Sequence, residues 1–146
     1  MAETASLVTV DTDPLAGLPG YVLRRAANAM MAELAERLGK VDLRISDATV
    51  LLLVADRADM TSSEIGKMLD IQRANMVPLL NRLEASGLIR REPIDRKSQA
   101  IVLTDEGRKR LIDVRRITET FEADLLARIP DEHRDHFVPA LQALIG

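Results

Sequence analysis

Gln72, Arg73 and Asn75 stand close together at the expected start of a helix, in the middle of a chain of 146 residues. In the major groove of duplex DNA, glutamine and asparagine can pair bidentately with adenine, and arginine with guanine. These residue types at this spacing therefore predict that the first turn of the helix reads base pairs. The alternative is a solvated helix start that has no ligand.

Asp95, Arg96 and Lys97 form a second candidate group, in a polar segment between two short apolar runs. An arginine at the tip of a hairpin can enter the narrow minor groove of A·T-rich DNA, where the negative potential is strong. The neighbouring Asp95 is expected to hold that guanidinium or to tie the turn. The alternative is an ordinary solvated, charged turn.

Thr61-Ser62-Ser63-Glu64 has the pattern of a capping box at the start of a short helix. In such a box the threonine hydroxyl and the glutamate carboxylate each accept a backbone N–H of the other residue. Amide groups at a helix start can also bind a phosphate, which makes Thr61, Ser62 and Ser63 candidate backbone contacts. As a cap alone, the segment needs no further function.

Charge is distributed unevenly along the chain. The formal net charge is -3, but residues 72–104 hold six basic and three acidic side chains, a local charge of +3. The remaining residues hold 14 basic and 20 acidic side chains. A basic middle within an acidic frame is typical of a protein in which one face meets phosphate.

Hydrophobic periodicity predicts the helices that position these residues. Apolar residues recur at helical spacing over Tyr21–Leu38, and Gly39 supplies the stop. Ser46 is expected to cap a second, mostly buried helix with the apolar body Thr49–Val54. Further helices are predicted after Thr61, over Gln72–Ser86, from Thr104 onward and after Pro130-Asp131.

Leu88–Arg91 and Ala100–Leu103 are strand-like runs on either side of the polar segment, and they predict a β-hairpin. A short capped helix, a tight turn, a second helix and a basic hairpin form a winged helix-turn-helix, so we expect a mainly α fold with one small β-hairpin. The long terminal helices retain apolar surface that commonly packs against a second subunit. The expected organisation is a mobile tail over 1–14 and one domain over 15–146, with a winged lobe at 45–104 and dimerisation helices at 18–40 and 105–146.

The composition excludes several classes of protein. Cysteine is absent, which rules out disulfides, thiolate metal sites and thiol redox sensing, and aromatic residues amount to 2%, which disfavours base stacking on single strands. The longest apolar run, 48–55, is too short for a membrane span, and the N-terminal residues lack a secretory pattern, so a cytoplasmic location is expected. His133 and His136 stand three residues apart, a weak metal signal that a helix start explains better. No catalytic motif is present, and we predict no enzyme activity, metal or cofactor.

Several short motifs share the order and spacing of one family. Residues 71–91, the Asp95-Arg96 pair and residues 101–107 resemble the MarR (multiple antibiotic resistance regulator) family, and the similarity extends over 20–145. The resemblance implies a homodimeric winged-helix regulator that binds pseudo-palindromic DNA and is commonly released by a small, often aromatic, effector. The matching positions are Leu83-Glu84, Gly87-Leu88-Ile89, Leu103-Thr104 and Gly107.

Three positions depart from the family pattern. Gln72 replaces a small hydroxyl residue, so the base preference should differ, and Pro78 should kink the recognition helix because it removes an internal amide. Ala48 replaces an aromatic residue, which would enlarge the effector cleft that the family places between its first, second and fifth helices. Each residue of that cleft has the alternative of being an ordinary interface or surface residue. The effector candidates that the resemblance implies are Tyr21, Arg24, Arg25, Asn28, Arg44, Ser46 and Ala48.

These observations predict a transcriptional repressor that binds double-stranded DNA as a homodimer and is released by a small effector. Family habit favours an aromatic acid or its CoA thioester as that effector. The alternative is a winged-helix module that binds another protein and has no specific DNA target, in which case binding would show little dependence on salt. The predicted DNA contacts are Ser62, Ser63, Gln72, Arg73, Asn75, Arg82, Arg96 and Lys97.

Overall fold

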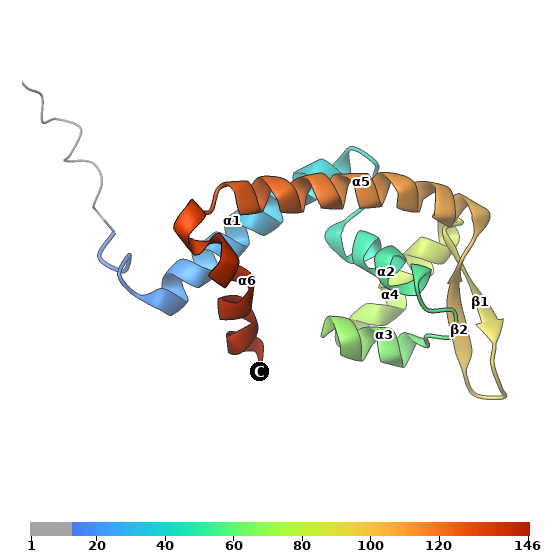
Figure 1. Ribbon diagram of the computed structural model, residues 1–146. Coiled ribbons are helices and arrows are strands. Elements are labelled where there is room, and N and C mark those ends of the chain that lie inside the picture. Colours follow the sequence, from blue (N-terminus) through green and yellow to red (C-terminus); the bar gives the residue numbers. More distant parts are fainter. Residues whose placement is uncertain (1–12) are drawn as a thin grey trace, which may run out of the picture. The chain divides into compact units, whose positions relative to one another are not determined.

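The computed structural model describes residues 13–146, and the predicted tail over 1–14 falls almost entirely outside them. The chain divides between Glu33 and Leu34 into two compact units. The described residues are mainly helical with one antiparallel hairpin, which confirms the predicted fold class (Figure 1). In chain order the elements are α1 (Pro19–Gly39), α2 (Ile45–Ala55), α3 (Ser62–Leu69), α4 (Arg73–Ala85), β1 (Ile89–Pro93), β2 (Gln99–Leu103), α5 (Asp105–Ala127) and α6 (Asp131–Ile145).

The start of α2 differs from the prediction, because Ser46 does not cap it. The N-cap is Arg44, whose backbone N–H donates to Oδ2 of Asp47 at 2.8 Å. An aspartate in the first turn also interacts favourably with the positive end of the helix dipole. Ser46 therefore lies inside the first turn of α2, where it is partly buried.

The ends of α3 and α4 follow the predicted local rules. The Thr61 hydroxyl accepts the N–H of Glu64 at 3.2 Å and the Glu64 carboxylate accepts the N–H of Thr61 at 3.0 Å, which confirms the capping box. The hydrogen bond from the Thr61 backbone holds the pKa of Glu64 below its ordinary value. Past the end of α4, Gly87 has a φ of 76°, which glycine adopts without steric cost. α4 continues through Pro78 to Ala85, so the proline does not end the helix, and the expected kink stays a prediction.

The core of the unit Leu34–Gly146 lies between α2, α4, α5 and the hairpin. α2 packs against α5 and β2, and α3 packs against α4 (Figure 1). One face of α4 is wholly buried in this core, at three- and four-residue steps, so the opposite face of the helix must point outward. The buried residues of α4 are Met76, Leu79, Leu80 and Leu83.

The hairpin is longer than predicted toward its loop. Ile89 pairs with Leu103 at one end and Pro93 pairs with Gln99 at the other. The backbone N–H of Ile101 donates to the carbonyl of Met60 at 2.8 Å, which ties β2 to the segment ahead of α3. In Figure 1 the β1–β2 loop projects away from the helices of the lobe. The hairpin is thus anchored along β2 and free at its tip.

The two C-terminal helices keep much of their apolar surface uncovered. α6 has no buried side chain, and α5 and α6 expose large aliphatic residues along their length. Exposed apolar surface of this kind marks an interaction site. Packing against a second subunit stays a prediction. None of the helices in residues 13–146 is both long enough and apolar enough to cross a membrane. The exposed aliphatic residues of α5 and α6 are Ile112, Leu126, Val138, Leu144 and Ile145.

Candidate nucleic-acid interface

α3, the start of α4 and the loop of the hairpin surround an open hollow of about 680 Å³. Most of the predicted DNA contacts lie around it, although they come from three separate segments of the sequence. Hydroxyl, amide and cationic side chains of this kind are the groups that bind phosphates and base edges. The predicted contacts that line the hollow are Ser62, Ser63, Gln72, Arg73 and Lys97.

Lys67 and Val77 also line the hollow, and the sequence analysis missed both. Lys67 follows Ser63 by four residues on α3, so the two side chains share one face of the helix. That spacing was the signal that could have found Lys67. Val77 is 54% exposed, and only the packing of α4 shows which of its apolar residues face outward.

The polar residues at the start of α4 are available to a ligand. Gln72 is the N-cap of α4, but its side chain makes no capping hydrogen bond. Gln72, Arg73 and Asn75 are all exposed, and within residues 13–146 none of the three has a side-chain hydrogen bond or ion pair. Asn75 is not among the residues that line the hollow. This first turn therefore presents unpaired donors and acceptors, as base readout requires.

Arg82 has a structural partner, which separates it from the other predicted contacts. Its Nη2 lies 2.6 Å from Oδ1 of Asp47, a residue that is 4% exposed. The other oxygen of Asp47 accepts the backbone N–H of Arg44, so one carboxylate joins the start of α2 to α4. The Nε of Arg82 is buried and has no hydrogen-bond partner among the described residues. This contact positions α4, and the predicted contact of Arg82 with DNA stays a prediction.

Asp95 ties the loop of the hairpin, which is one of its two expected roles. Its Oδ1 accepts the backbone N–H of Lys97 at 2.8 Å and that of Ser98 at 2.9 Å. These hydrogen bonds hold the pKa of Asp95 below its ordinary value. Arg96 and Lys97 are exposed, and neither has an ion-pair partner in the described part of the chain. The tip of the hairpin thus offers two unpaired cations.

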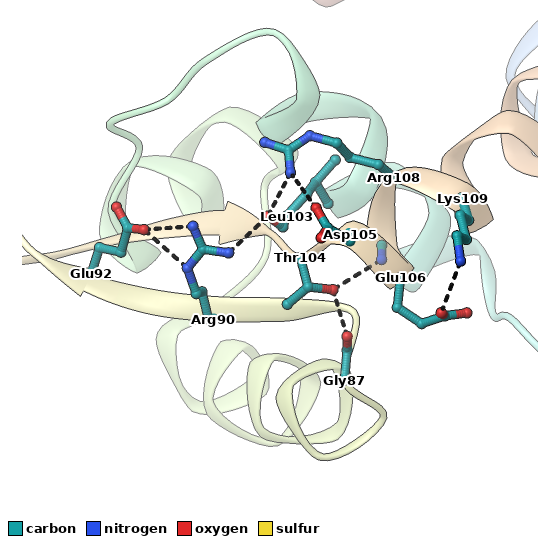
Figure 2. Close-up of polar contacts among 10 residues, drawn as sticks. Gly87, Arg90, Glu92, Leu103, Thr104, Asp105, Glu106, Arg108 and Lys109 are labelled. Atoms are coloured by element: carbon teal, nitrogen blue, oxygen red, sulfur yellow. Dashed lines mark hydrogen bonds and ion pairs between the residues drawn. The ribbon is translucent and has the colours of Figure 1, made fainter.

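Polar contacts fasten the base of the hairpin to the start of α5 (Figure 2). The Thr104 hydroxyl donates to the carbonyl of Gly87 at 2.6 Å and accepts the N–H of Gly107 at 2.9 Å. On β1, Arg90 binds one carboxylate oxygen of Glu92 through Nε at 2.9 Å and through Nη2 at 2.8 Å. The direction of the hairpin is therefore set by α4 and α5 together, because Thr104 touches the ends of both.

Replacing Thr104 with valine should lower the free energy of unfolding by about 1–2 kcal/mol, because valine keeps the shape but loses both hydrogen bonds. Urea denaturation followed by circular dichroism measures this loss. Thr104→Ser retains the hydroxyl and should stay close to the original stability. Equal losses for the two variants would show that the hydroxyl does not carry the contact.

Four of the effector candidates belong to the unit that precedes Leu34, and two of them lie beside the aromatic ring of a third. The guanidinium groups of Arg24 and Arg25 lie 5.8 and 5.9 Å from the centre of the Tyr21 ring. The Tyr21 hydroxyl donates to Asp13 at 2.9 Å, and Arg25 pairs with the same carboxylate at 3.3 Å. The backbone N–H of Leu15, then the Tyr21 hydroxyl and Arg25, lower the pKa of Asp13. The fourth candidate, Asn28, is exposed on α1.

The remaining effector candidates lie at the start of α2. The side chain of Arg44 is exposed, and Ser46 is partly buried. Ala48 is 3% exposed and belongs to the hydrophobic core. Position 48 therefore belongs to the packed interior of this structure. The roles of all seven candidates in effector binding stay predictions.

His133 and His136 are exposed at the start of α6. Residues 13–146 contain no group of three or more histidine, cysteine, aspartate or glutamate side chains that could hold a metal ion. The histidine pair therefore gains no third ligand from the described part of the fold.

Comparison with known proteins relates the chain to one family. The MarR family profile matches residues 41–98, which extend from the segment before α2 to the loop of the hairpin. The uncharacterized HTH-type transcriptional regulator YwoH of Bacillus subtilis (strain 168) is 28% identical over 118 residues, which are 80% of this chain and 86% of that protein.

Solved structures are similar over nearly the whole chain. The transcriptional repressor CouR bound to a 23-mer DNA duplex is 30% identical, with a TM-score of 0.84 over 94% of this chain and 99% of that chain. CouR bound to p-coumaroyl-CoA is 28% identical, with a TM-score of 0.82 over 93% of this chain and 97% of that chain. These relatives are transcriptional regulators rather than enzymes, which confirms the predicted non-enzymatic class. With the winged lobe, the exposed polar turn of α4 and the cationic hairpin tip, these similarities show that the chain belongs to the MarR family of DNA-binding transcriptional regulators.

Proposed function

We propose that the protein is a repressor that binds a pseudo-palindromic operator as a homodimer. Each subunit places the start of α4 in the major groove and Arg96 in the flanking minor groove. Two-fold symmetry then sets the half-sites about one helical turn, ~10 bp, apart. The observation that carries the proposal is the likeness to the repressor CouR in complex with a DNA duplex, which extends over 94% of the chain.

The charges of the hollow support this placement. Three of the four charged residues that line it are cations, since Lys67, Arg73 and Lys97 reach it from α3, α4 and the hairpin loop beside the single carboxylate of Asp70. None of the three cations has an ion-pair partner among residues 13–146. Cations from three elements on one side of the lobe suit a ligand whose charges repeat along its length, as the phosphates of a duplex do. The exposed aliphatic residues of α5 and α6 support the second subunit.

We also propose a small effector that releases the DNA, of the class of aromatic acids or their CoA thioesters. The similarity to CouR bound to p-coumaroyl-CoA supports this class. An effector can act only if it binds one arrangement of the recognition helices more tightly than the other. The guanidinium groups of Arg24, Arg25 and Arg44 are the candidate partners for its acid group.

The experiment that tests the proposal begins with selection of binding sites from randomised duplexes by the full chain. We expect an inverted repeat, and an affinity measured by fluorescence anisotropy that falls linearly with salt concentration on a double logarithmic scale. Adding p-coumaroyl-CoA, p-coumarate or CoA separately then tests the effector class. Failure to enrich any sequence contradicts the operator, and DNA binding unchanged by all three compounds contradicts the effector class.

Arg96→Ala should weaken operator binding about tenfold, because each dimer loses two cations from the minor groove. Anisotropy titration of the selected duplex measures this change. Arg116→Ala is the control, since Arg116 is an exposed arginine on α5, outside the hollow and the hairpin. If the two variants bind with equal affinity, the hairpin does not enter the groove.

A further inference from the structure

The outward face of α4 carries a short aliphatic strip. Ala74, Val77, Pro78 and Asn81 have the spacing i, i+3, i+4 and i+7, which places them on one side of the helix, and all four are exposed. The buried residues of α4 have the same spacing shifted by two positions, and they lie on the opposite side. The face that must meet a ligand of α4 is therefore mostly hydrocarbon.

The oxygen of the one polar side chain in the strip is already engaged. The Oδ1 of Asn81 accepts a hydrogen bond from Nη2 of Arg91 at 3.0 Å, and Nε of the same arginine binds Glu84 at 3.2 Å. Apart from the NH₂ group of Asn81, the strip thus presents only the side chains of Ala74, Val77 and Pro78. None of these three side chains can donate or accept a hydrogen bond.

The surroundings of the strip indicate what covers it. Val77 is 54% exposed and lines the hollow together with the cations Lys67, Arg73 and Lys97. A protein partner with a large apolar surface would leave these cations without counter-charges. A duplex supplies phosphates to the cations and, on the floor of its major groove, one apolar group, which is the C5-methyl of thymine.

We infer that Val77, flanked by Ala74 and Pro78, recognises thymine methyl groups in each half-site of the operator. Base selection by this chain then combines hydrogen bonds from Gln72 and Arg73 with an apolar contact from the middle of α4. Val77 can make this contact only if α4 occupies the major groove, as proposed above.

Deoxyuridine provides the test, because it pairs like thymidine and lacks only the methyl group. Each thymine of the selected half-site is replaced singly by deoxyuridine, and the affinity of the full chain is measured by anisotropy. At a contacted position we expect a three- to fivefold loss, which is the effect of about one buried CH₂-sized group. Replacement in both half-sites should weaken binding about tenfold or more.

The variant Val77→Ala tests whether Val77 is the residue that contacts the thymine methyl group. The shorter side chain should weaken binding to the thymine duplex, and the penalty for deoxyuridine at the contacted position should disappear. Val138→Ala is the matched control, because Val138 is a valine on α6 with a similar exposure of 50%. In that variant the deoxyuridine penalty should remain complete, whatever happens to the overall affinity.

The outcomes separate this inference from the proposed function. Absence of any selected sequence contradicts operator binding itself. Selective binding to sites without thymine, or to sites in which every thymine tolerates deoxyuridine, overturns the role of the strip and leaves operator binding intact. A deoxyuridine penalty of the same size in Val77→Ala and in the original chain also overturns it, because another residue then makes the contact.

Discussion

Replacing Gly107 with alanine is expected to destabilise the winged lobe by about 3 kcal/mol or more, because the added atom has no space. A Cβ at this position would collide with the carbonyl oxygen of Leu88 and would lie 3.3 Å from the side chain of Leu103. The Leu88 carbonyl cannot turn away without cost, since it accepts the backbone N–H of Thr104 at 3.1 Å. The start of α5 must therefore move away from the hairpin.

Urea denaturation of Gly107→Ala measures this loss, and binding to the selected operator should weaken in parallel as the hairpin shifts. Gly20→Ala is the control, because Gly20 also lies in a helix and a Cβ there would meet nothing within 4 Å. Alanine in a helix is intrinsically favourable, so this control should retain its stability or gain slightly. Equal stability of the two variants would mean that the start of α5 is not packed against Leu88 as described.

Asp47→Ala should cost about 2–4 kcal/mol of stability, slightly less than a fully buried ion pair, because the Arg82 side chain is 34% exposed. The change leaves the guanidinium of Arg82 without its partner, although its Nε is already unsatisfied among the described residues. It also removes the acceptor for the N–H of Arg44. Because Arg82 lies on α4, we expect weaker operator binding as well.

The matched control for this prediction is Asp113→Ala. Asp113 pairs with Arg116 at 2.7 Å, but both side chains are more than one third exposed, so the loss should stay below about 1 kcal/mol. Asp47→Asn keeps an acceptor for Arg44 and should fall between the original chain and Asp47→Ala. A loss for Asp47→Ala no larger than that for Asp113→Ala would rule out a positioning role for the buried pair.

Local chemistry made the elements predictable. Thr61 and Glu64 interact within one turn, and Thr104 caps the helix that follows it, so their bonds depend on only a few neighbouring residues. Ser46 failed as a cap because Asp47 competes for the same helix start and is also held by an arginine far away in the sequence. The failure of this prediction thus has one local cause, the bond to Arg44, and one tertiary cause, the contact with Arg82.

Local sequence patterns also made part of the interface predictable. Gln72, Arg73 and Lys97 were identifiable because a polar helix start and a basic hairpin tip are local patterns, and the hollow between α3, α4 and the loop brings them together. Arg82 was predicted to contact DNA, but in the structure it pairs with a buried aspartate of α2. The periodicity of α4 alone does not reveal this partner. Val77 entered the site only through the packing of α4, whereas the four-residue spacing from Ser63 could have identified Lys67.

By itself the sequence determined the order of the helices, the hairpin, the basic middle of the chain and the polar start of α4, because each depends on residues close together along the chain. Only the tertiary structure decided which arginine holds the recognition helix, which lysines share the hollow and which face of α4 is left exposed and aliphatic. Those outcomes depend on which side chains the core buries, and burial is fixed by contacts between segments that are distant in the sequence.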